Sequence, residues 1–367
     1  MATTSLHRAK AERNDEFYTQ YPDIEKEIGA YLEFDPDAFR GKSVLLPCDD
    51  PEWSNFTKFF AQNFSRLGLR KLVSTSYAPA AKRAAAGYSP SIFETSSKSF
   101  DPQRSRANGR IFVLEGDVTG DGKIDADDLQ YEYLRGTGDF RSDEVRRLRD
   151  EADVIVTNPP FSLFREFVPW IFEAGKQCVI VGNMNAITYS EVFPLLKSDR
   201  FWLGATGSGS DMVFGVPPGA KVSDADRRKA EKLGYVGNYT RMGNACWFTN
   251  MEHGRRHTPL SLMTAEGNIR YSRHKDIRGA PYARYDNYDA IEVPYVDAIP
   301  SDYDGVMGVP VTFLDKYCPE QFEILGCTES EGKGFSNGLW TDTACAQPLV
   351  GGVRRYKRLF IRHRRTR

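Results

Sequence analysis

The sequence predicts an α/β fold built on a doubly wound, mainly parallel sheet, followed by a second region. Strand-like and helix-like segments alternate through the first half of the chain, as they do in doubly wound sheets. Several of the strand-like segments are continuous apolar runs, which is typical of strands buried on both faces. Beyond Gly219 the chain becomes aromatic and irregular. We therefore expect an α/β core over residues 1–219 and a separate region over residues 220–367.

Composition limits the classes of protein that the chain can belong to. Its 367 residues suffice for two domains or one large one, and its formal net charge of −1 gives no overall attraction to nucleic acid. Any affinity for DNA must then come from local basic patches. The six cysteines show no CxxC spacing, which argues against a zinc site and favours reduced thiols in the cytoplasm. Residues 1–13 are polar and charged, and no long apolar run follows, so we expect no secretion signal and no membrane span.

The first elements follow from apolar runs and helix-stop signals. Residues 42–46 predict a short strand that ends in Pro47-Cys48-Asp49-Asp50-Pro51. A helix is expected over 54–67, and the aromatic stripe on one of its sides favours core packing over a ligand site. Gly68 is expected to close this helix before a strand that starts at residue 71.

The remaining core elements follow in order. Residues 78–108 are rich in Ala, Ser, Pro, Lys and Arg and predict a mobile surface insertion, either a plain loop or a DNA contact. Strands are expected over 110–115, 152–157 and 177–182, with a helix over 164–174.

The segment Asn158-Pro159-Pro160-Phe161 directly follows the predicted strand 152–157. Two prolines end sheet pairing and produce a rigid loop at the carboxyl edge of the sheet, where open α/β sheets hold their ligands. An Asn oxygen and a backbone carbonyl of the Pro-Pro segment can accept the two N–H groups of an adenine amine. These bonds localise the lone pair of the nitrogen for attack on a sulfonium methyl group. Phe161 would stack on the base once it leaves the helix. The alternative is a turn that only terminates the strand.

An acidic loop over residues 117–128 fits the spacing of a calcium loop. Oxygen ligands would come from Asp117, Thr119, Asp121, Asp125 and Asp128, with Gly122 at the turn. A strand instead of a helix precedes the loop, and no second copy exists. The alternative is an ordinary acidic connection, and methyl transfer itself needs no metal.

Basic residues gather in two places of the second region. One cluster contains Arg255 and Arg256, and the other, near the carboxyl terminus, contains Arg354, Arg355, Lys357 and Arg358. Phosphate contacts with DNA are the expected role, and solvated surface is the alternative for each residue. His253 and His257 have a helical spacing, but without Cys or acidic neighbours they do not predict a metal site.

Nine segments together resemble the EcoRI-type family of adenine-specific DNA methyltransferases. They span nearly the whole chain in the expected order, so the resemblance is more specific than the tetrapeptide alone. The segments are residues 15–20, 48–51, 138–142, 158–166, 182–186, 244–249, 285–290, 302–310 and 356–361.

The resemblance implies a Rossmann-like core that uses S-adenosylmethionine to methylate the N6 amine of a flipped adenine in double-stranded DNA. Phe17, Tyr18, Thr19 and Asp49 would then line the methionine end of the cofactor. Asp139 would accept from the amine of the cofactor's own adenine, with Phe140 packing on that ring. For Asp49 and Asp50, a role as ordinary cap or turn residues is the alternative. Many methyltransferases carry a Gly-rich turn after the first strand, whereas residues 47–51 contain no glycine, a departure that the EcoRI-type family shares.

The sequence thus predicts a site-specific adenine methyltransferase with a catalytic core over 1–219 and a DNA-recognition region over 220–367. Two rival hypotheses remain: methylation of a protein amide or an RNA base, and a calcium-stabilised DNA-binding protein without catalysis. We expect a monomer in the cytoplasm of a bacterial or phage-infected cell, with a cognate restriction endonuclease as an open question. The recognition sequence is not readable from the chain.

Overall fold

The computed structural model describes residues 18–50, 54–78, 95, 97, 99–124, 128–206, 212–216, 222–328 and 347–364. Phe17, Asp125 and most of the predicted insertion over 78–108 lie outside these residues. The chain divides into two compact units. Unit 1 contains residues 1–184 and 209–252, and unit 2 contains residues 185–208 and 253–367.

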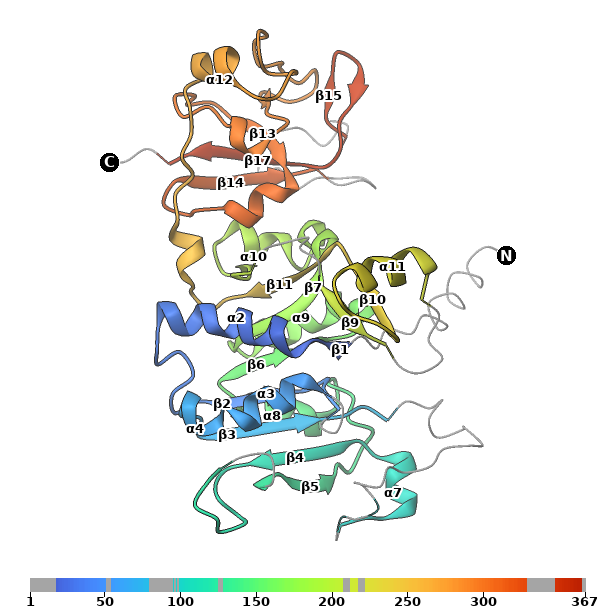
Figure 1. The fold of residues 1–367 in the computed structure, drawn as a ribbon. Helices are drawn as coiled ribbons and strands as arrows, with labels where there is room; N and C mark the ends of the chain where they lie inside the picture. Colours follow the sequence, from blue (N-terminus) through green and yellow to red (C-terminus); the bar gives the residue numbers. More distant parts are fainter. Residues whose placement is uncertain are drawn as a thin grey trace. The chain divides into compact units, whose positions relative to one another are not determined.

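Unit 1 is an α/β unit with a mixed sheet (Figure 1). Its helices and 3₁₀ helix are α2 (Tyr21–Phe34), α3 (Asn55–Gln62), α4 (Phe64–Leu67), α7 (Pro102–Ala107), α8 (Asp143–Glu151), η2 (Phe161–Leu163), α9 (Phe164–Glu173) and α11 (Asp224–Lys232). Its strands are β1 (Tyr18–Thr19), β2 (Ser43–Leu46), β3 (Lys71–Thr75), β4 (Arg110–Leu114), β5 (Gln130–Tyr133), β6 (Val154–Thr157), β7 (Gln177–Asn183), β9 (Val213–Gly215), β10 (Tyr239–Arg241) and β11 (Ala245–Thr249).

The main sheet of unit 1 runs in the order β5-β4-β3-β2-β6-β7-β11. Its centre is parallel, because β2 pairs in parallel with β3 and β6, and β6 with β7. The predicted strands and the α/β class are confirmed. The edges differ from the predicted parallel sheet, since β4 runs antiparallel to β3, β5 to β4, and β11 to β7.

The two faces of this sheet carry different helices, which follows from the alternation of side chains along each strand. Buried residues of α2, α3 and α4 form one core cluster with alternate residues of β2, β6, β7 and β11. On the other face, Gly182 of β7 allows close packing, because a Cβ there would lie 2.6 Å from the ring of Phe164 in α9. The aromatic side chains at 56, 59, 60 and 64 are all buried in the first cluster, which confirms the prediction of core packing.

The helix predicted over 54–67 forms in two pieces. Ser54 caps α3 through a hydrogen bond from the backbone N–H of Phe56 to its hydroxyl, and Gly68 ends α4 in the left-handed region, as predicted. The prediction of an unstructured insertion was wrong at its end, where Asp101 caps helix α7 and Pro102 starts it.

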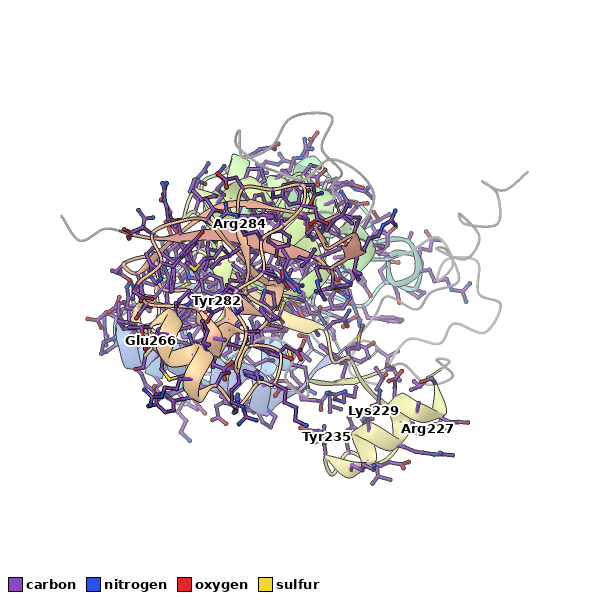
Figure 2. All side chains as sticks on the ribbon, turned by 90° about the horizontal axis from the view of Figure 1, so that it is seen from above. Arg227, Lys229, Tyr235, Glu266, Tyr282 and Arg284 are labelled. Carbon is purple, nitrogen blue, oxygen red and sulfur yellow. The ribbon has the colours of Figure 1, made fainter. Side chains whose placement is uncertain are left out.

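A smaller antiparallel sheet of order β1-β9-β10 also belongs to unit 1, and α11 lies between β9 and β10 in the sequence. Ala230 is the buried residue of α11, and Figure 2 shows the Arg227 and Lys229 side chains projecting outward from this helix. This small sheet and α11 belong to the same compact unit as the main sheet. The sequence instead predicts that the second region begins at residue 220. The chain returns to the main sheet because β11 pairs with β7.

Unit 2 contains a sheet of order β12-β13-β17-β14 and a separate hairpin, β15-β16. Its strands are β8 (Trp202–Leu203), β12 (Ile291–Glu292), β13 (Met307–Pro310), β14 (Phe322–Cys327), β15 (Leu349–Val350), β16 (Val353–Arg354) and β17 (Arg358–His363). Its helices are α10 (Phe193–Lys197) and α12 (Ala265–Tyr271), and its 3₁₀ helices are η4 (Gly254–His257), η5 (Val296–Ala298) and η6 (Val311–Lys316). The chain passes from unit 1 into unit 2 within η3 (Met184–Thr188). In the described part of the chain, no helix is long and apolar enough to span a membrane.

Candidate active site

Unit 1 has a topological switch point between β2 and β6. From β2 the chain continues to β3 on one side, whereas β6 and β7 extend the sheet on the other side. Open α/β sheets bind ligands in the crevice at the carboxyl ends of such strands. In this chain those ends carry the Pro47–Asp50 loop and the segment that starts at Asn158. Two of the predicted site segments therefore leave the same edge of the sheet.

Asp49 links these two segments directly. The hydroxyl of Thr157, the last residue of β6, donates to Asp49 Oδ2 at 2.6 Å, and the hydroxyl of Ser54 donates to Oδ1 at 2.9 Å. Asp49 is buried, and burial raises the pKa of its carboxyl to about 7, while the two hydroxyl donors only partly offset this rise. A positively charged group of a ligand would stabilise the ionised form of this buried carboxylate, because its two hydroxyl donors are neutral.

Thr19 in β1 lies near the same carboxylate. The side-chain amide of Asn55, which follows Ser54, donates to the Thr19 carbonyl at 2.8 Å. In the described part of the chain, the hydroxyl of Thr19 is buried and has no hydrogen-bond partner. Buried polar groups are rarely left in this state, so the hydroxyl is suited to a ligand. Asn55 thus connects Thr19 of β1 to the start of α3, where the neighbouring Ser54 donates to Asp49.

The loop after β2 contains no glycine and is held in place by side chains. The hydroxyl of Ser74 donates to the carbonyl of Asp49 at 2.8 Å, and that of Thr75 donates to the carbonyl of Pro47 at 3.1 Å. Asp50 forms an ion pair with Arg110, which is buried. Residues of β3 and β4 therefore fix the backbone of this loop without a Gly-rich turn.

Asp139 and Phe140 lie on the loop between β5 and α8. The Asp139 carboxylate accepts three hydrogen bonds from Arg141, at 2.9 Å from the backbone N–H, 2.9 Å from Nε and 2.7 Å from Nη2. Arg141 lowers the pKa of Asp139 in consequence. Phe140 is buried edge-on against Phe167 and Trp170, with ring centroids 5.1 Å and 5.6 Å away. Arg141 lies over the same ring, and the sequence analysis assigned it no role.

The charges of Asp49 and Asp139 both act on the Cys48 thiol. Burial of the sulfur raises its pKa, and the charges of Asp49 and Asp139 raise it further. Both carboxylates thus act electrostatically on the same side chain, and the contribution of Asp49 is the larger one.

Gly138 positions the loop that carries Asp139. It has a φ of +79°, and a Cβ there would lie 2.1 Å from the carbonyl oxygen of Ser76, just after β3. We expect Gly138→Ala to lower Tm by roughly 5–10 °C, because the loop must both change conformation and move away from β3. Scanning calorimetry of the full chain measures this shift.

Gly136→Ala is the matched control, since a Cβ at Gly136 would meet only the Glu144 carboxylate, at 3.8 Å. Its Tm should stay within about 1 °C of the original value. Equal shifts for the two variants would contradict the close approach at Gly138.

The Asn158–Phe161 segment leaves the buried strand β6, as predicted. Asn158 is half-buried and Pro159 is buried. The Pro160 carbonyl already accepts the N–H of Leu163 at 2.9 Å, which starts η2. Of the two proline carbonyls, that of Pro159 is therefore the better candidate to accept from a substrate amine. Phe161 is half-buried and packs against the core cluster of unit 1.

Carboxylates of the acidic loop accept hydrogen bonds from the loop's own backbone N–H groups. Asp128 accepts from the N–H groups of Val118 and Thr119, both at 2.8 Å, and Asp117 accepts from those of Gly120 and Gly122. Among the described residues, which omit Asp125, no group of three or more His, Cys, Asp or Glu side chains could hold a metal ion. The prediction of calcium binding through Asp117, Thr119, Asp121, Asp125 and Asp128 gains no support from the described residues.

The predicted DNA contacts in unit 2 fall into buried and exposed groups. Arg256 is buried, stacks on Trp202 with its guanidinium carbon 3.8 Å from the ring centroid, and pairs with Asp199 at 3.5 Å. Arg255 pairs with Asp315 and donates to the Ala205 carbonyl at 3.0 Å. These contacts favour a structural role for both arginines.

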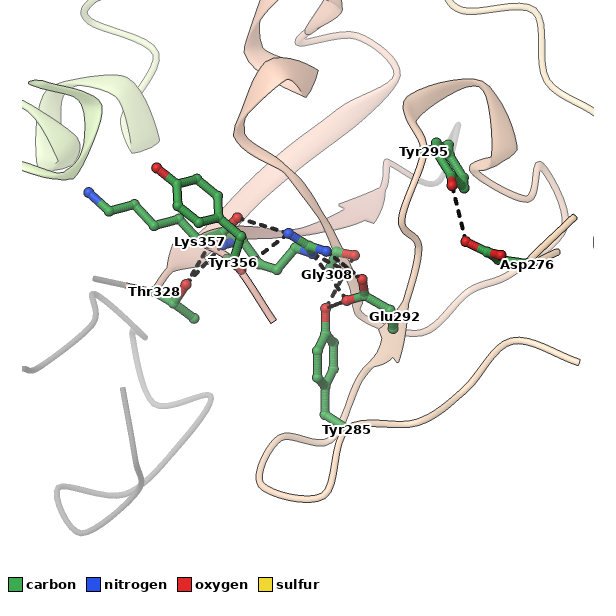
Figure 3. A network of polar contacts seen from close by, with 9 residues as sticks. Asp276, Tyr285, Glu292, Tyr295, Gly308, Thr328, Tyr356 and Lys357 are labelled. Carbon is green, nitrogen blue, oxygen red and sulfur yellow. Dashed lines mark hydrogen bonds and ion pairs between the residues drawn. The ribbon is translucent and has the colours of Figure 1, made fainter. Parts of the chain in front are cut away.

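Arg358 is also buried, unlike the other basic residues of its cluster. Its guanidinium donates to Glu292 at 2.6 Å, and Tyr285 donates to the same carboxylate (Figure 3). A buried and paired guanidinium of this kind holds β17 to β12 and is not available to phosphate. Arg354 and Arg355 are exposed, and Lys357 is half-buried with its amine 3.3 Å from the Thr188 hydroxyl.

The fold and the site geometry define a class of protein. The sheet is parallel at its centre, and at its switch point the Pro47–Asp50 loop follows β2 and Asn-Pro-Pro-Phe follows the neighbouring strand β6. This is the arrangement of an S-adenosylmethionine-dependent methyltransferase.

Comparison with known proteins identifies the family. The family model for the adenine-specific methyltransferase EcoRI matches residues 5–364, and the chain belongs to this family. It is 40% identical to the type II methyltransferase M.EcoRI of Escherichia coli over 87% of this chain and 88% of that protein. It is 33% identical to M.MpnI of Mycoplasma pneumoniae over 98% of both chains, and 31% identical to M.MgeORF184P of Mycoplasma genitalium over 97% and 98%. No solved structure matches the chain.

Family membership confirms the predicted activity. The protein is a site-specific, adenine-specific DNA methyltransferase that uses S-adenosylmethionine. The family and its relatives favour DNA over the RNA, protein and non-catalytic alternatives.

Proposed function

We propose that the enzyme methylates the N6 amine of an adenine that has rotated out of duplex DNA, with the chemistry carried by Asn158, Pro159 and Phe161. The observation that supports this most is the hydrogen bond from Thr157 to Asp49. It joins the residue before Asn158 to the carboxylate proposed for the methionine end of the cofactor, so the two reactants would meet at one edge of the sheet.

Asn158 and Pro159 prepare the amine for attack in this proposal. The Asn158 side-chain oxygen and the Pro159 carbonyl each accept one N–H of the amine, which shifts its nitrogen toward tetrahedral geometry. Pro159 and Pro160 hold the second acceptor in place, because proline fixes φ. The half-buried ring of Phe161 stacks on the extruded base and compensates for the stacking lost in the duplex.

Asp49, Thr19 and Tyr18 hold the cofactor's methionine end. S-adenosylmethionine supplies, when bound, a methyl group on a positively charged sulfur. The ammonium group at that end suits the buried Asp49 carboxylate, and the unpartnered hydroxyl of Thr19 suits a polar group of the same ligand. We assign Asp139 to the amine of the cofactor's adenine, because its Oδ2 accepts one hydrogen bond from Arg141 and has a second lone pair for the N–H of that amine.

We assign catalysis to unit 1, which contains all of these residues, and target recognition to unit 2, which carries the exposed Arg354 and Arg355. No residue of the acidic loop over 117–128 has a role in the proposed reaction. We also propose that the enzyme acts as a monomer in a bacterial cytoplasm. The type II names of its relatives favour a cognate restriction endonuclease that shares its recognition sequence.

The identity of the product tests the proposal. Duplex DNA of mixed sequence is incubated with the enzyme and labelled S-adenosylmethionine, and the DNA is then digested to nucleosides. We expect the label in N6-methyladenine. Label in cytosine, or no labelled nucleoside at all, would overturn it, and so would label that appears only when RNA or protein replaces the DNA.

A further inference from the structure

The hairpin β15-β16 of unit 2 is a tight two-stranded ribbon. Leu349 pairs with Arg354 and Val350 with Val353, and the turn between them is Gly351-Gly352. Both glycines have positive φ, +57° and +75°, which suits a two-residue turn of the type that matches the twist of a hairpin.

Two polar residues from a distant part of the chain hold the ribbon in place. The Asp286 carboxylate accepts the N–H of Gly351 at 3.0 Å and that of Gly352 at 2.7 Å. The Asn287 amide donates to the Gln347 carbonyl at 2.9 Å and accepts the N–H of Leu349 at 3.0 Å. The turn and the first strand are thus fixed by side chains and do not depend on a DNA partner.

The first strand of the ribbon is also anchored by apolar contact. Val350, next to the turn, packs against a cluster formed by Tyr285, Tyr288, Ala290 and Phe360. A hairpin that is held at its turn and along its first strand presents its second strand rigidly.

The second strand and the two residues after it, Arg355 and Tyr356, display apolar and basic side chains together. Val353 is 59% exposed and Tyr356 is 67% exposed, and Arg354 and Arg355 are exposed beside them. Figure 3 shows Tyr356 extending away from the buried Glu292 carboxylate that binds Arg358. The two arginines and the Tyr356 hydroxyl would suit phosphates, but the exposed Val353 beside them adds nothing to phosphate binding.

We propose that this hairpin enters the major groove of the target DNA and reads bases of the recognition sequence, with Asp286 and Asn287 as its positioning residues. The inference rests on the proposed function, since it assumes methylation at a specific duplex sequence. The major groove admits a two-stranded ribbon, arginine pairs with guanine edges there, and apolar side chains contact thymine methyl groups. A rigid ribbon carries these groups at lower entropic cost than a flexible loop.

The test compares recognition sequences. The enzyme and its variants methylate a pool of duplexes with a randomised segment, and sequencing maps the methylated adenines. We expect Arg354→Ala to relax one or more positions of the wild-type recognition sequence, by roughly 5- to 100-fold in the preference for the original base. Arg362→Ala is the matched control. It removes the same charge from an exposed residue of β17 that pairs with Glu323, and it should leave every position unchanged.

Asp286 is tested as a positioning residue by a graded series. Asp286→Ala should relax the same positions as Arg354→Ala while leaving the dissociation constant for S-adenosylmethionine unchanged. Asp286→Asn retains one accepting oxygen for the turn and should restore part of the preference. A merely structural role would instead lower the yield of folded enzyme or the turnover without changing the recognised sequence.

Two results would overturn the inference. One is a uniform loss of methylation by Arg354→Ala at all sites with an unaltered recognition sequence, which would mark a phosphate contact. The other is no effect of either Arg354→Ala or Asp286→Ala. A wild-type enzyme that methylates no adenine in the pool would overturn the proposed function itself, and this result is distinct from the first two.

Discussion

Asn158→Ala is expected to lower the rate of methyl transfer at least 10²- to 10³-fold while DNA and cofactor binding change little. The Asn158 oxygen is one of two acceptors proposed for the adenine amine, and its bond strengthens as positive charge develops on the attacking nitrogen. Removing one preorganised group of this kind from an active site typically costs this much in rate. Single-turnover transfer of labelled methyl groups measures the chemical step without product release.

Two further variants sharpen this result. Asn158→Asp keeps one accepting oxygen and should retain more activity than the alanine variant. Asn63→Ala makes the same chemical change at a half-buried residue that donates to the Phe59 carbonyl in unit 1, and it should transfer at the wild-type rate. Equal loss of binding and turnover in Asn158→Ala would count against a catalytic role.

Cofactor affinity is expected to fall as the pH decreases through about 7, the pKa to which burial raises the Asp49 carboxyl. The ammonium group of the cofactor requires the ionised carboxylate, and below pH 7 the free enzyme holds a proton there. Affinity should therefore weaken nearly tenfold per pH unit below about pH 6. Calorimetric titration between pH 5.5 and 8.5, in buffers of different ionisation enthalpy, also measures the proton released on binding.

Asp49→Asn removes the titrating group. Its cofactor affinity should be lower than that of the wild type at pH 8 and nearly independent of pH. The unbound variant should be more stable than the wild type at pH 8, because a raised pKa means that stability from Asp49 is lost as the pH rises through 7. Asp23→Asn is the control, since burial raises the pKa of Asp23 to about 6, outside the proposed site. A pH dependence that survives in Asp49→Asn, or vanishes in Asp23→Asn, would contradict the assignment.

The core elements of unit 1 could be predicted because their signals are local. The apolar runs before Pro47 and Asn158 form buried parallel strands, and Ser54 and Gly68 mark helix ends in their own sequence. The antiparallel direction of β4 and the return of β11 to the sheet depend on pairing partners far away in the chain. No local pattern encodes them.

The same distinction separates the catalytic residues from the DNA contacts. Asn158 and Asp49 follow strands directly, so their edge of the sheet was predictable, although the Thr157 bond between them was not. Arg358 belonged to a basic cluster by sequence, yet Glu292, 66 residues away, binds it in the interior. Charge clustering in sequence thus says little about exposure when the counter-charge is remote. The Asp286 clamp on the Gly351-Gly352 turn was missed for the same reason.

The loop after β2 owes its shape to separate hydroxyl groups on Ser54, Ser74, Thr75 and Thr157, each with its own acceptor on that loop. A glycine turn works only if each glycine is kept, because any side chain strains the backbone at once. Independent hydroxyls can instead be exchanged singly, Ser for Thr or either for a small apolar residue, at a cost of about 1 kcal/mol each. Such a loop can drift in small steps under selection, and the fit of the cofactor can be adjusted gradually without passing through an inactive enzyme.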